Sequence, residues 1–282
     1  MINRLSRLPF ATYKTPILLG VMGLNFLLTG VDVLMAHSQN NFFRWELIPL
    51  IFSPLAVFAI LAQLIFHANT VVKRVFKTMM WLGVFVGVAG TSFHLAGNAT
   101  SSQESLYRLL IEGSPVAAPI AFAGISSYAL VSENNQGTAR RSKLLILVGL
   151  GFLGAVVAAF LDHARLAFIP SYTLIPLVSG TLAVISCFYL AYSRANPTET
   201  YIFLSILALN MLAGILGFGF HVLGDLAGTQ SIIWVRFLYR DPLLGPLLFC
   251  NLALLGGLSL LPEPAVMLGD NKGEETRVIS SS

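Results

Sequence analysis

Long apolar runs separated by short polar connections dominate the chain. Runs such as Pro16 to Met35 and Leu144 to Leu161 have about the length that crosses the hydrocarbon core of a bilayer. The pattern predicts about eight membrane helices, near residues 15–36, 47–67, 78–98, 115–131, 143–163, 171–193, 200–225 and 242–261. We therefore expect an all-α, polytopic membrane helix bundle.

Two Ser/Asp-Pro pairs give local signals for helix starts. Ser114-Pro115 and Asp241-Pro242 each combine an N-cap residue with a proline suited to the first helical position. These pairs predict the starts of the fourth and eighth helices.

The chain also repeats itself. A shift of 127 residues aligns it with itself without a gap from about Leu47 to Phe122. In this register Gly, His and Pro positions coincide: Gly87, Gly90, Phe93, His94, Gly97, Pro115 and Pro119 repeat as Gly214, Gly217, Phe220, His221, Gly224, Pro242 and Pro246. The repeat predicts two tandem four-helix units of the same orientation, related by a pseudo-twofold axis along the membrane normal.

The expected domains follow from the repeat and from the basic residues. They are a cytoplasmic segment 1–14, a first repeat 15–131, a cytoplasmic linker 132–142, a second repeat 143–261 and a disordered cytoplasmic tail 262–282. Lys and Arg divide 12 against 5 between the two sets of loops, and the richer set includes both termini. The positive-inside rule then predicts cytoplasmic termini, in the bacterial inner membrane or an equivalent one.

Composition agrees with a lipid-embedded chain. Hydrophobic residues make up 56% of it and charged residues only 11%, with a mean hydropathy of +0.78. Soluble domains carry about 25% charged residues. The pI near 9.2 does not indicate nucleic-acid binding, because the basic residues are spread over short loops and form no single patch. The lipid bilayer is the predicted partner, and any protein partner is open.

The candidate chemistry lies near the outer ends of the odd-numbered helices. His94 and His221 occupy matching repeat positions, on helix faces shared with glycines that allow close approach of a helix or of a flat cofactor. Asp225 follows His221 by four residues, where the first repeat has Asn98. Asp162 and His163 end the fifth helix, as Asp32 and His37 end the first.

Ionisable residues inside membranes are costly and tend to carry function. His94 and His221 are candidate ligands of haem b or of a transition metal, with Asp225, Asp162 and His163 as further metal ligands. Two alternatives stay open: a structural hydrogen bond across a packing face, and a proton or ion relay in a transporter or accessory protein. His67 is expected to be a solvated interface residue. No catalytic motif of a known hydrolase or phosphate-binding enzyme occurs in the sequence.

Overall fold

A computed structural model describes residues 13–38, 42–101, 110–111, 113–193, 196–229, 235, 237 and 243–262. All regular elements in these ranges are helices, which confirms the all-α prediction. The α-helices are α3 (Lys14–Ser38), α4 (Leu47–Ile65), α5 (Thr70–Ser101), α7 (Ile120–Asn134), α8 (Gly137–Ala164), α9 (Ile175–Tyr192), α10 (Pro197–Leu226) and α12 (Leu247–Ser259). Two short 3-10 helices, η1 (Arg44–Glu46) and η2 (Ser171–Leu174), precede α4 and α9.

Six of the helices in the described residues are long and apolar enough to cross a membrane: α3, α4 together with η1, α5, α8, α9 and α10. Their outer faces carry large apolar side chains, such as Phe58, Trp81 and Phe85, that are more than 60% exposed. Exposing such a large apolar surface to water is energetically unfavourable, whereas the acyl chains of lipids can cover it without this penalty. The chain is an integral membrane helical protein. α7 and α12 are shorter, with 15 and 13 residues, or about 20 Å each.

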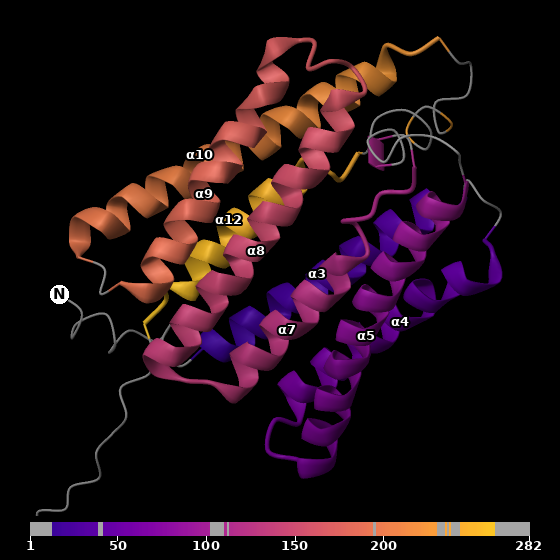
Figure 1. Ribbon diagram of the computed structural model, residues 1–282. Helices are drawn as coiled ribbons and strands as arrows, with labels where there is room; N and C mark the ends of the chain where they lie inside the picture. Colours follow the sequence, from indigo (N-terminus) through magenta and orange to yellow (C-terminus); the bar gives the residue numbers. More distant parts are fainter. Residues whose placement is uncertain are drawn as a thin grey trace, which may run out of the picture.

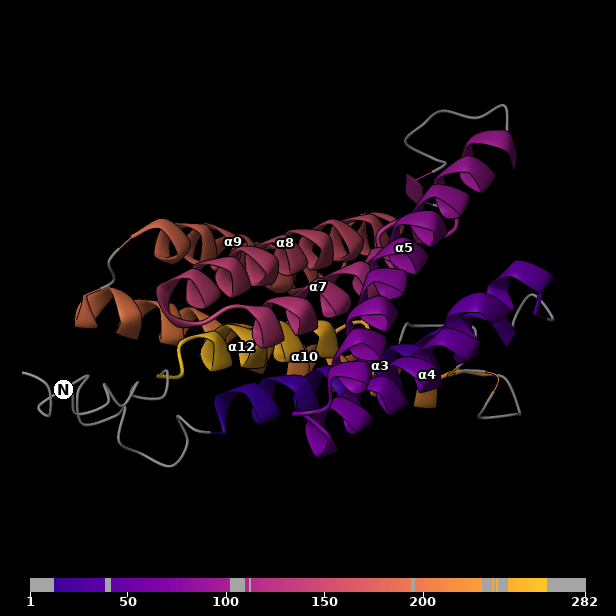
Figure 2. The ribbon, with the colours of Figure 1, turned by 90° about the horizontal axis from the view of Figure 1, so that it is seen from below.

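The helices pack in two four-helix groups. In the first group, α3 and α5 each contact α4 and α7; in the second, α8 and α10 each contact α9 and α12. The groups meet where α7 packs against α8 and α12 packs against α3. Figures 1 and 2 show α4 and α5 on one flank of the molecule and α9 and α10 on the opposite flank.

Aromatic side chains and glycines hold each group together. The rings of Phe26, Phe52 and Phe122 join α3, α4 and α7, with centroid distances of 5.8 to 6.2 Å. In the second group Phe152 and Phe249 join α8 and α12 at 6.3 Å. Small residues elsewhere in each group let neighbouring backbones approach closely.

Polar side chains also join the two groups. The amides of Asn25 and Asn251 donate to each other between α3 and α12. Lys14 Nζ at the start of α3 donates to Leu261 O just after α12, at 2.6 Å. Arg140 Nε near the start of α8 donates to Asn135 O just after α7. The first helix of each group is thus tied to the end of the fourth helix of the other group.

The fourth helix does not begin at Pro115, so that prediction is wrong. Residues 113–119 form bends and turns, and α7 begins at Ile120. The reason is Pro119: it has no N–H and cannot donate the helical hydrogen bond to Pro115 O. Ala118 N donates to that oxygen instead, at 3.3 Å. The matching pair Asp241-Pro242 lies outside the described residues.

Helix boundaries differ elsewhere in smaller ways. α5 begins at Thr70 and ends at Ser101, so it extends beyond the predicted 78–98 at both ends. α8 begins at Gly137, inside the predicted linker 132–142, and only residues 135–136 separate it from α7. Polar and basic residues at helix ends lower the hydropathy there without ending the helix.

Candidate functional site

The fold brings two histidines together at one end of the first group. His37 is the last residue but one of α3, and His94 lies in the last third of α5. Their ring centroids are 6.4 Å apart, with 43° between the ring planes. Both side chains are half-buried. We call these two residues the first histidine pair.

Backbone carbonyl groups orient both rings. His94 Nδ1 lies 3.0 Å from Pro115 O, and His37 Nδ1 lies 3.4 Å from Glu46 O. A carbonyl oxygen only accepts, so each Nδ1 carries the proton in these bonds. Each Nε2 then holds a lone pair. Histidines that bind metals show this arrangement, in which a backbone carbonyl fixes the tautomer and the ring orientation.

The glycine face of α5 explains why Pro115 lies beside His94. A Cβ added at Gly87 would stand 2.5 Å from Ala123 N, and one at Gly90 would stand 2.8 Å from Pro119 Cβ. Both glycines therefore serve the close packing of α7 on α5, which brings the turns before α7 next to the ring of His94. One turn further, a Cβ at Gly97 would meet no atom of the described residues within 4 Å.

Glu46 adds a carboxylate to this end of the group. Its Oε2 accepts from Phe43 N at 2.8 Å, which fixes the start of η1. The backbone carbonyl of the same residue lies at His37 Nδ1, so Glu46 belongs to the surroundings of the first histidine pair. The site therefore gathers side chains and carbonyls from α3, η1, α5 and the turns before α7.

His221 lies on α10, in the other group. It is half-buried, and Asp225 one turn further along α10 is fully buried. Tyr172 of η2 stacks on Phe220, the neighbour of His221, with ring centroids 4.8 Å apart. The helices of His94 and His221, α5 and α10, pack in different groups on opposite flanks (Figure 1).

The remaining candidates have separate surroundings. His163 is half-buried and is the last residue but one of α8. Asp162 Oδ1 lies 4.0 Å from Arg165 Nη1, and Arg165 Nε donates to Ile111 O at 2.6 Å. His67 is exposed in the turn between α4 and α5, as expected. Asp32 is also exposed on α3.

Within the described ranges, no three His, Cys, Asp or Glu side chains lie close enough together to hold a metal ion. The first histidine pair offers at most two imidazole nitrogens. Two imidazole nitrogens suit a centre that obtains its other ligands elsewhere: a porphyrin, water or a substrate.

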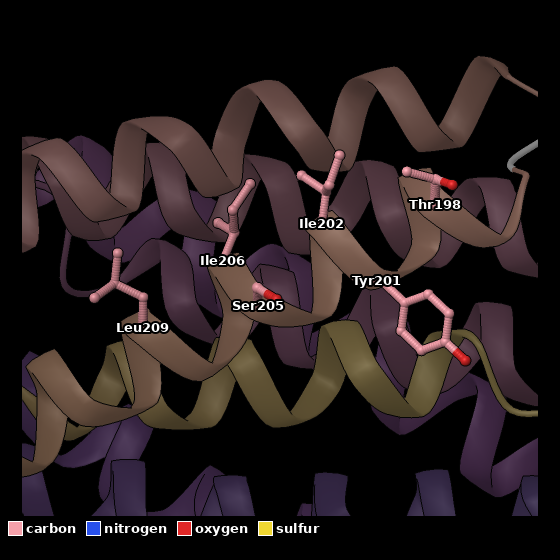
Figure 3. Close-up of a pocket in the computed structure, with 6 residues that line it drawn as sticks. All are labelled: Thr198, Tyr201, Ile202, Ser205, Ile206 and Leu209. Atoms are coloured by element: carbon pink, nitrogen blue, oxygen red, sulfur yellow. The ribbon is translucent and has the colours of Figure 1, made fainter.

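A hollow of about 450 Å³ lies away from these histidines, along the first half of α10 (Figure 3). Its lining side chains all come from α10: Thr198, Tyr201, Ile202, Ser205, Ile206 and Leu209. Figure 3 shows them along one side of the helix, with no acid, histidine or cysteine among them. The hollow is an open, mostly apolar surface, and it offers no ligands for a metal.

Sequence reasoning missed His37 as the neighbour of His94. The sequence carries a signal only for the bond of His94 to Pro115 O, because Pro119 cannot supply the helical donor to that oxygen. Besides the turn bond from Ala118 N, the oxygen can then accept from a histidine at the end of the preceding helix. The chain matches no known protein family, no curated protein and no solved structure, so its function has to be inferred from the site itself.

Proposed function

We propose that this membrane protein binds a transition-metal centre, as haem b or as a metal ion, through histidines at the outer end of its helix bundle. One observation carries the proposal: the ring centroids of His37 and His94 lie 6.4 Å apart, and each ring has Nδ1 at a backbone carbonyl. Both Nε2 atoms are thereby prepared to act as ligands.

The spacing of the rings fits ligation from opposite sides. Two imidazoles that bind one iron in this way have ring centres about 6 Å apart, since each metal–nitrogen bond is about 2 Å long and a ring nitrogen lies about 1 Å from its ring centre. Haem iron needs only two protein ligands, because the porphyrin supplies the other four. The two-ligand character of the site therefore favours haem over a bare ion.

A proton relay is the second candidate, and Glu46 favours it. Glu46, whose backbone carbonyl lies at His37 Nδ1, adds a carboxylate beside two neighbouring histidines, and such a set of groups could pass a proton along. A relay needs the lone pairs of both Nε2 atoms, as metal binding does. The two candidates differ in whether the purified protein contains a metal.

We also infer that the two four-helix groups are tandem copies of one unit. Buried positions support this, because they coincide at the shift of 127 residues. In α5 and α10 the matching buried pairs are Phe76 and Phe203, Met80 and Leu207, Gly83 and Asn210, and Gly87 and Gly214. In α7 and α12 they are Phe122 and Phe249, Ile125 and Leu252, Tyr128 and Leu255, Ala129 and Gly256, and Ser132 and Ser259.

Contacts between the groups support a pseudo-twofold axis. The hydroxyl of Tyr128 donates to the carbonyl of Leu255, which is its own counterpart at this shift. A position can touch its own counterpart only close to the axis that relates the two copies. The axis would then pass between α7 and α12, and it would run along the membrane normal because both units have the same orientation. In this arrangement α7 and α12 cross the membrane with the help of the turns that precede them, shielded by their longer neighbours.

The side of the membrane follows from the basic residues. Lys14, Lys73 and Arg140 lie near the starts of α3, α5 and α8, at the end of the bundle opposite to the histidines. The positive-inside rule assigns that end to the cytoplasm. The histidines would then face the extracytoplasmic side.

The test is an absorption spectrum of the detergent-purified protein, oxidised and reduced, with elemental analysis of the same sample. Haem b gives a Soret band with sharp bands after reduction, and the band should fall in His37→Ala and in His94→Ala. A metal in stoichiometric amount without a Soret band identifies an ion at the same ligands. His67→Ala is the matched control, because His67 is exposed in a turn, and it should leave the content unchanged. Protein with neither metal nor haem, prepared without chelators, overturns the proposal in favour of the relay.

A further inference from the structure

We propose that His163 and His221 form a second site for the same kind of metal centre, so that each four-helix group carries its own histidine pair. This inference rests on the proposed metal-binding function. It replaces the shared site between His94 and His221 that the tandem repeat first suggests.

The first helices of the two groups, α3 and α8, have matching buried faces. The buried residues of α3 and α8 coincide at a shift of 126 residues, one less than the shift of the other helices. The matching buried pairs are Lys14 and Arg140, Leu18 and Leu144, Leu19 and Leu145, Met22 and Val148, Gly23 and Gly149, and Phe26 and Phe152. Both helices also end in register, at Ser38 and Ala164. The repeat therefore includes the first helix.

The shift of 126 makes His163 the counterpart of His37. Each is the last residue but one of its helix, and each is half-buried. At the shift of 127, His221 is the counterpart of His94. Both members of the first histidine pair thus recur as histidines. The change of shift falls in the connection between α8 and η2, which is one residue longer than the connection between α3 and η1.

The surroundings recur as well. η2 stands before α9 as η1 stands before α4, and the stacked rings of Tyr172 and Phe220 hold η2 beside the position before His221. Gly214 and Gly217 bring the start of α12 onto α10, since an added Cβ would lie 2.7 Å from Pro246 O and 3.0 Å from Pro246 Cβ respectively. Gly87 and Gly90 do the same for α7 on α5. The start of α12 is therefore positioned on α10, the helix of His221, by the same glycine contacts as the start of α7 on α5, the helix of His94.

The charges around the two sites differ. Thr173 replaces Glu46, so the carboxylate of η1 is absent from η2. The Thr173 side chain is 93% buried, and its hydroxyl makes no hydrogen bond within the described part of the chain. Asp225 replaces Asn98, which adds a fully buried acid one turn beyond His221. Two metal centres in such different electrostatic surroundings should differ in reduction potential.

Metal or haem stoichiometry of the full-length protein tests this proposal. We expect two equivalents per chain in the wild type. His163→Ala and His221→Ala should each lose one equivalent, His37→Ala and His94→Ala should each lose the other, and His94→Ala with His221→Ala should lose both. A variant that keeps one equivalent is folded, so its loss of the other cannot be attributed to unfolding. A redox titration of the wild type should resolve two components, of which each single variant keeps one.

Three other results each have a separate meaning. One equivalent that depends on His37 and His94 but not on His163 or His221 overturns the second site and leaves the proposed function in place. One equivalent that disappears in both His94→Ala and His221→Ala, with His37→Ala unaffected, overturns it in favour of a shared site. No metal centre in the wild type overturns the proposed function itself.

Discussion

The hydroxyl of Tyr128 on α7 donates a hydrogen bond to the carbonyl oxygen of Leu255 on α12, at 3.0 Å, although 127 residues separate them in the chain. The same hydroxyl lies 3.1 Å from Ser259 Oγ. Both contacts are buried, and they join the two four-helix groups at the proposed axis. They make a direct target for testing how firmly the groups are joined.

Tyr128→Phe should weaken this junction by about 1 kcal/mol, the usual net contribution of one hydrogen bond. The cost stays modest because Ser259 Oγ already donates to Leu255 O at 2.7 Å, so the carbonyl keeps a partner. The measurement is the thermal unfolding midpoint in detergent. Tyr189→Phe is the control: Tyr189 is exposed and bonds to Glu199 on the surface of a single group, so the midpoint should not move. Equal effects of both variants would contradict a special role of the junction.

Gly87→Ala and Gly214→Ala should each destabilise the protein by about 1–3 kcal/mol, because the new methyl group would overlap the start of α7 or α12. It would stand 2.5 Å from Ala123 N in the first variant and 2.7 Å from Pro246 O in the second. Thermal unfolding in detergent measures both.

Gly97→Ala and Gly219→Ala are the controls for this pair, on the same two helices. Their added methyl groups meet no atom of the described residues within 4 Å, and alanine is the better helix former, so stability should hold or rise. If Gly87→Ala were as harmless as Gly97→Ala, the close contact between α5 and α7 would be wrong.

If the first histidine pair binds the proposed metal centre, Pro119→Ala should lower the affinity by about 10- to 100-fold, as loss of an outer hydrogen bond does at known metal sites. The substitution supplies an N–H that can bond to Pro115 O and so competes with His94 Nδ1 for that oxygen. Alanine keeps the Cβ that contacts Gly90. Metal or haem titration measures the change.

Pro197→Ala is the matched control for this variant. Pro197 is the first residue of α10, where the N–H has no partner within the helix in any case. It should leave the affinity unchanged. An unchanged affinity in Pro119→Ala as well would show that the carbonyl of Pro115 does not set the basicity of His94.

Asn25→Leu should destabilise the protein by about 1–3 kcal/mol, because it leaves the half-buried amide of Asn251 without its reciprocal partner. The double variant with Asn251→Leu should cost less than the sum of the two single variants, since no unpaired amide remains. Unfolding of the four proteins in detergent gives this double-mutant cycle. Additive effects would indicate that the two amides do not bond to each other.

Much of the fold could be predicted from hydropathy alone, because each helix must present an apolar face to lipid. The exact ends could not, since the basic starts of α5 and α8 look like loops although they continue the helices. The predicted start of a helix at Pro115 was wrong for a different reason. Ser114-Pro115 is a suitable pair for a helix start, but Pro119 has no N–H and removes the hydrogen bond that the first turn needs. The start of α7 therefore depends on both Pro115 and Pro119, and not on the Ser114-Pro115 pair alone.

The candidate site was only partly predictable. His94 could be selected from the repeat, whereas its neighbour His37 lies on another helix, and only packing shows which helix ends meet. A gapless shift of 127 also pairs His37 with Ala164, which hides its likeness to His163. The one-residue difference between the two connections becomes visible only when the buried faces of α3 and α8 are compared.

The bond from Lys14 Nζ to Leu261 O has a consequence for the connectivity of the chain. It brings the beginning of α3 to the end of α12, just as Arg140 brings the beginning of α8 to the end of α7. The two four-helix groups of the described residues therefore meet at two seams, between α12 and α3 and between α7 and α8. A circular permutant that joins the ends through a short linker and opens between Asn135 and Gln136 would begin with α8 and still keep every helix contact described here.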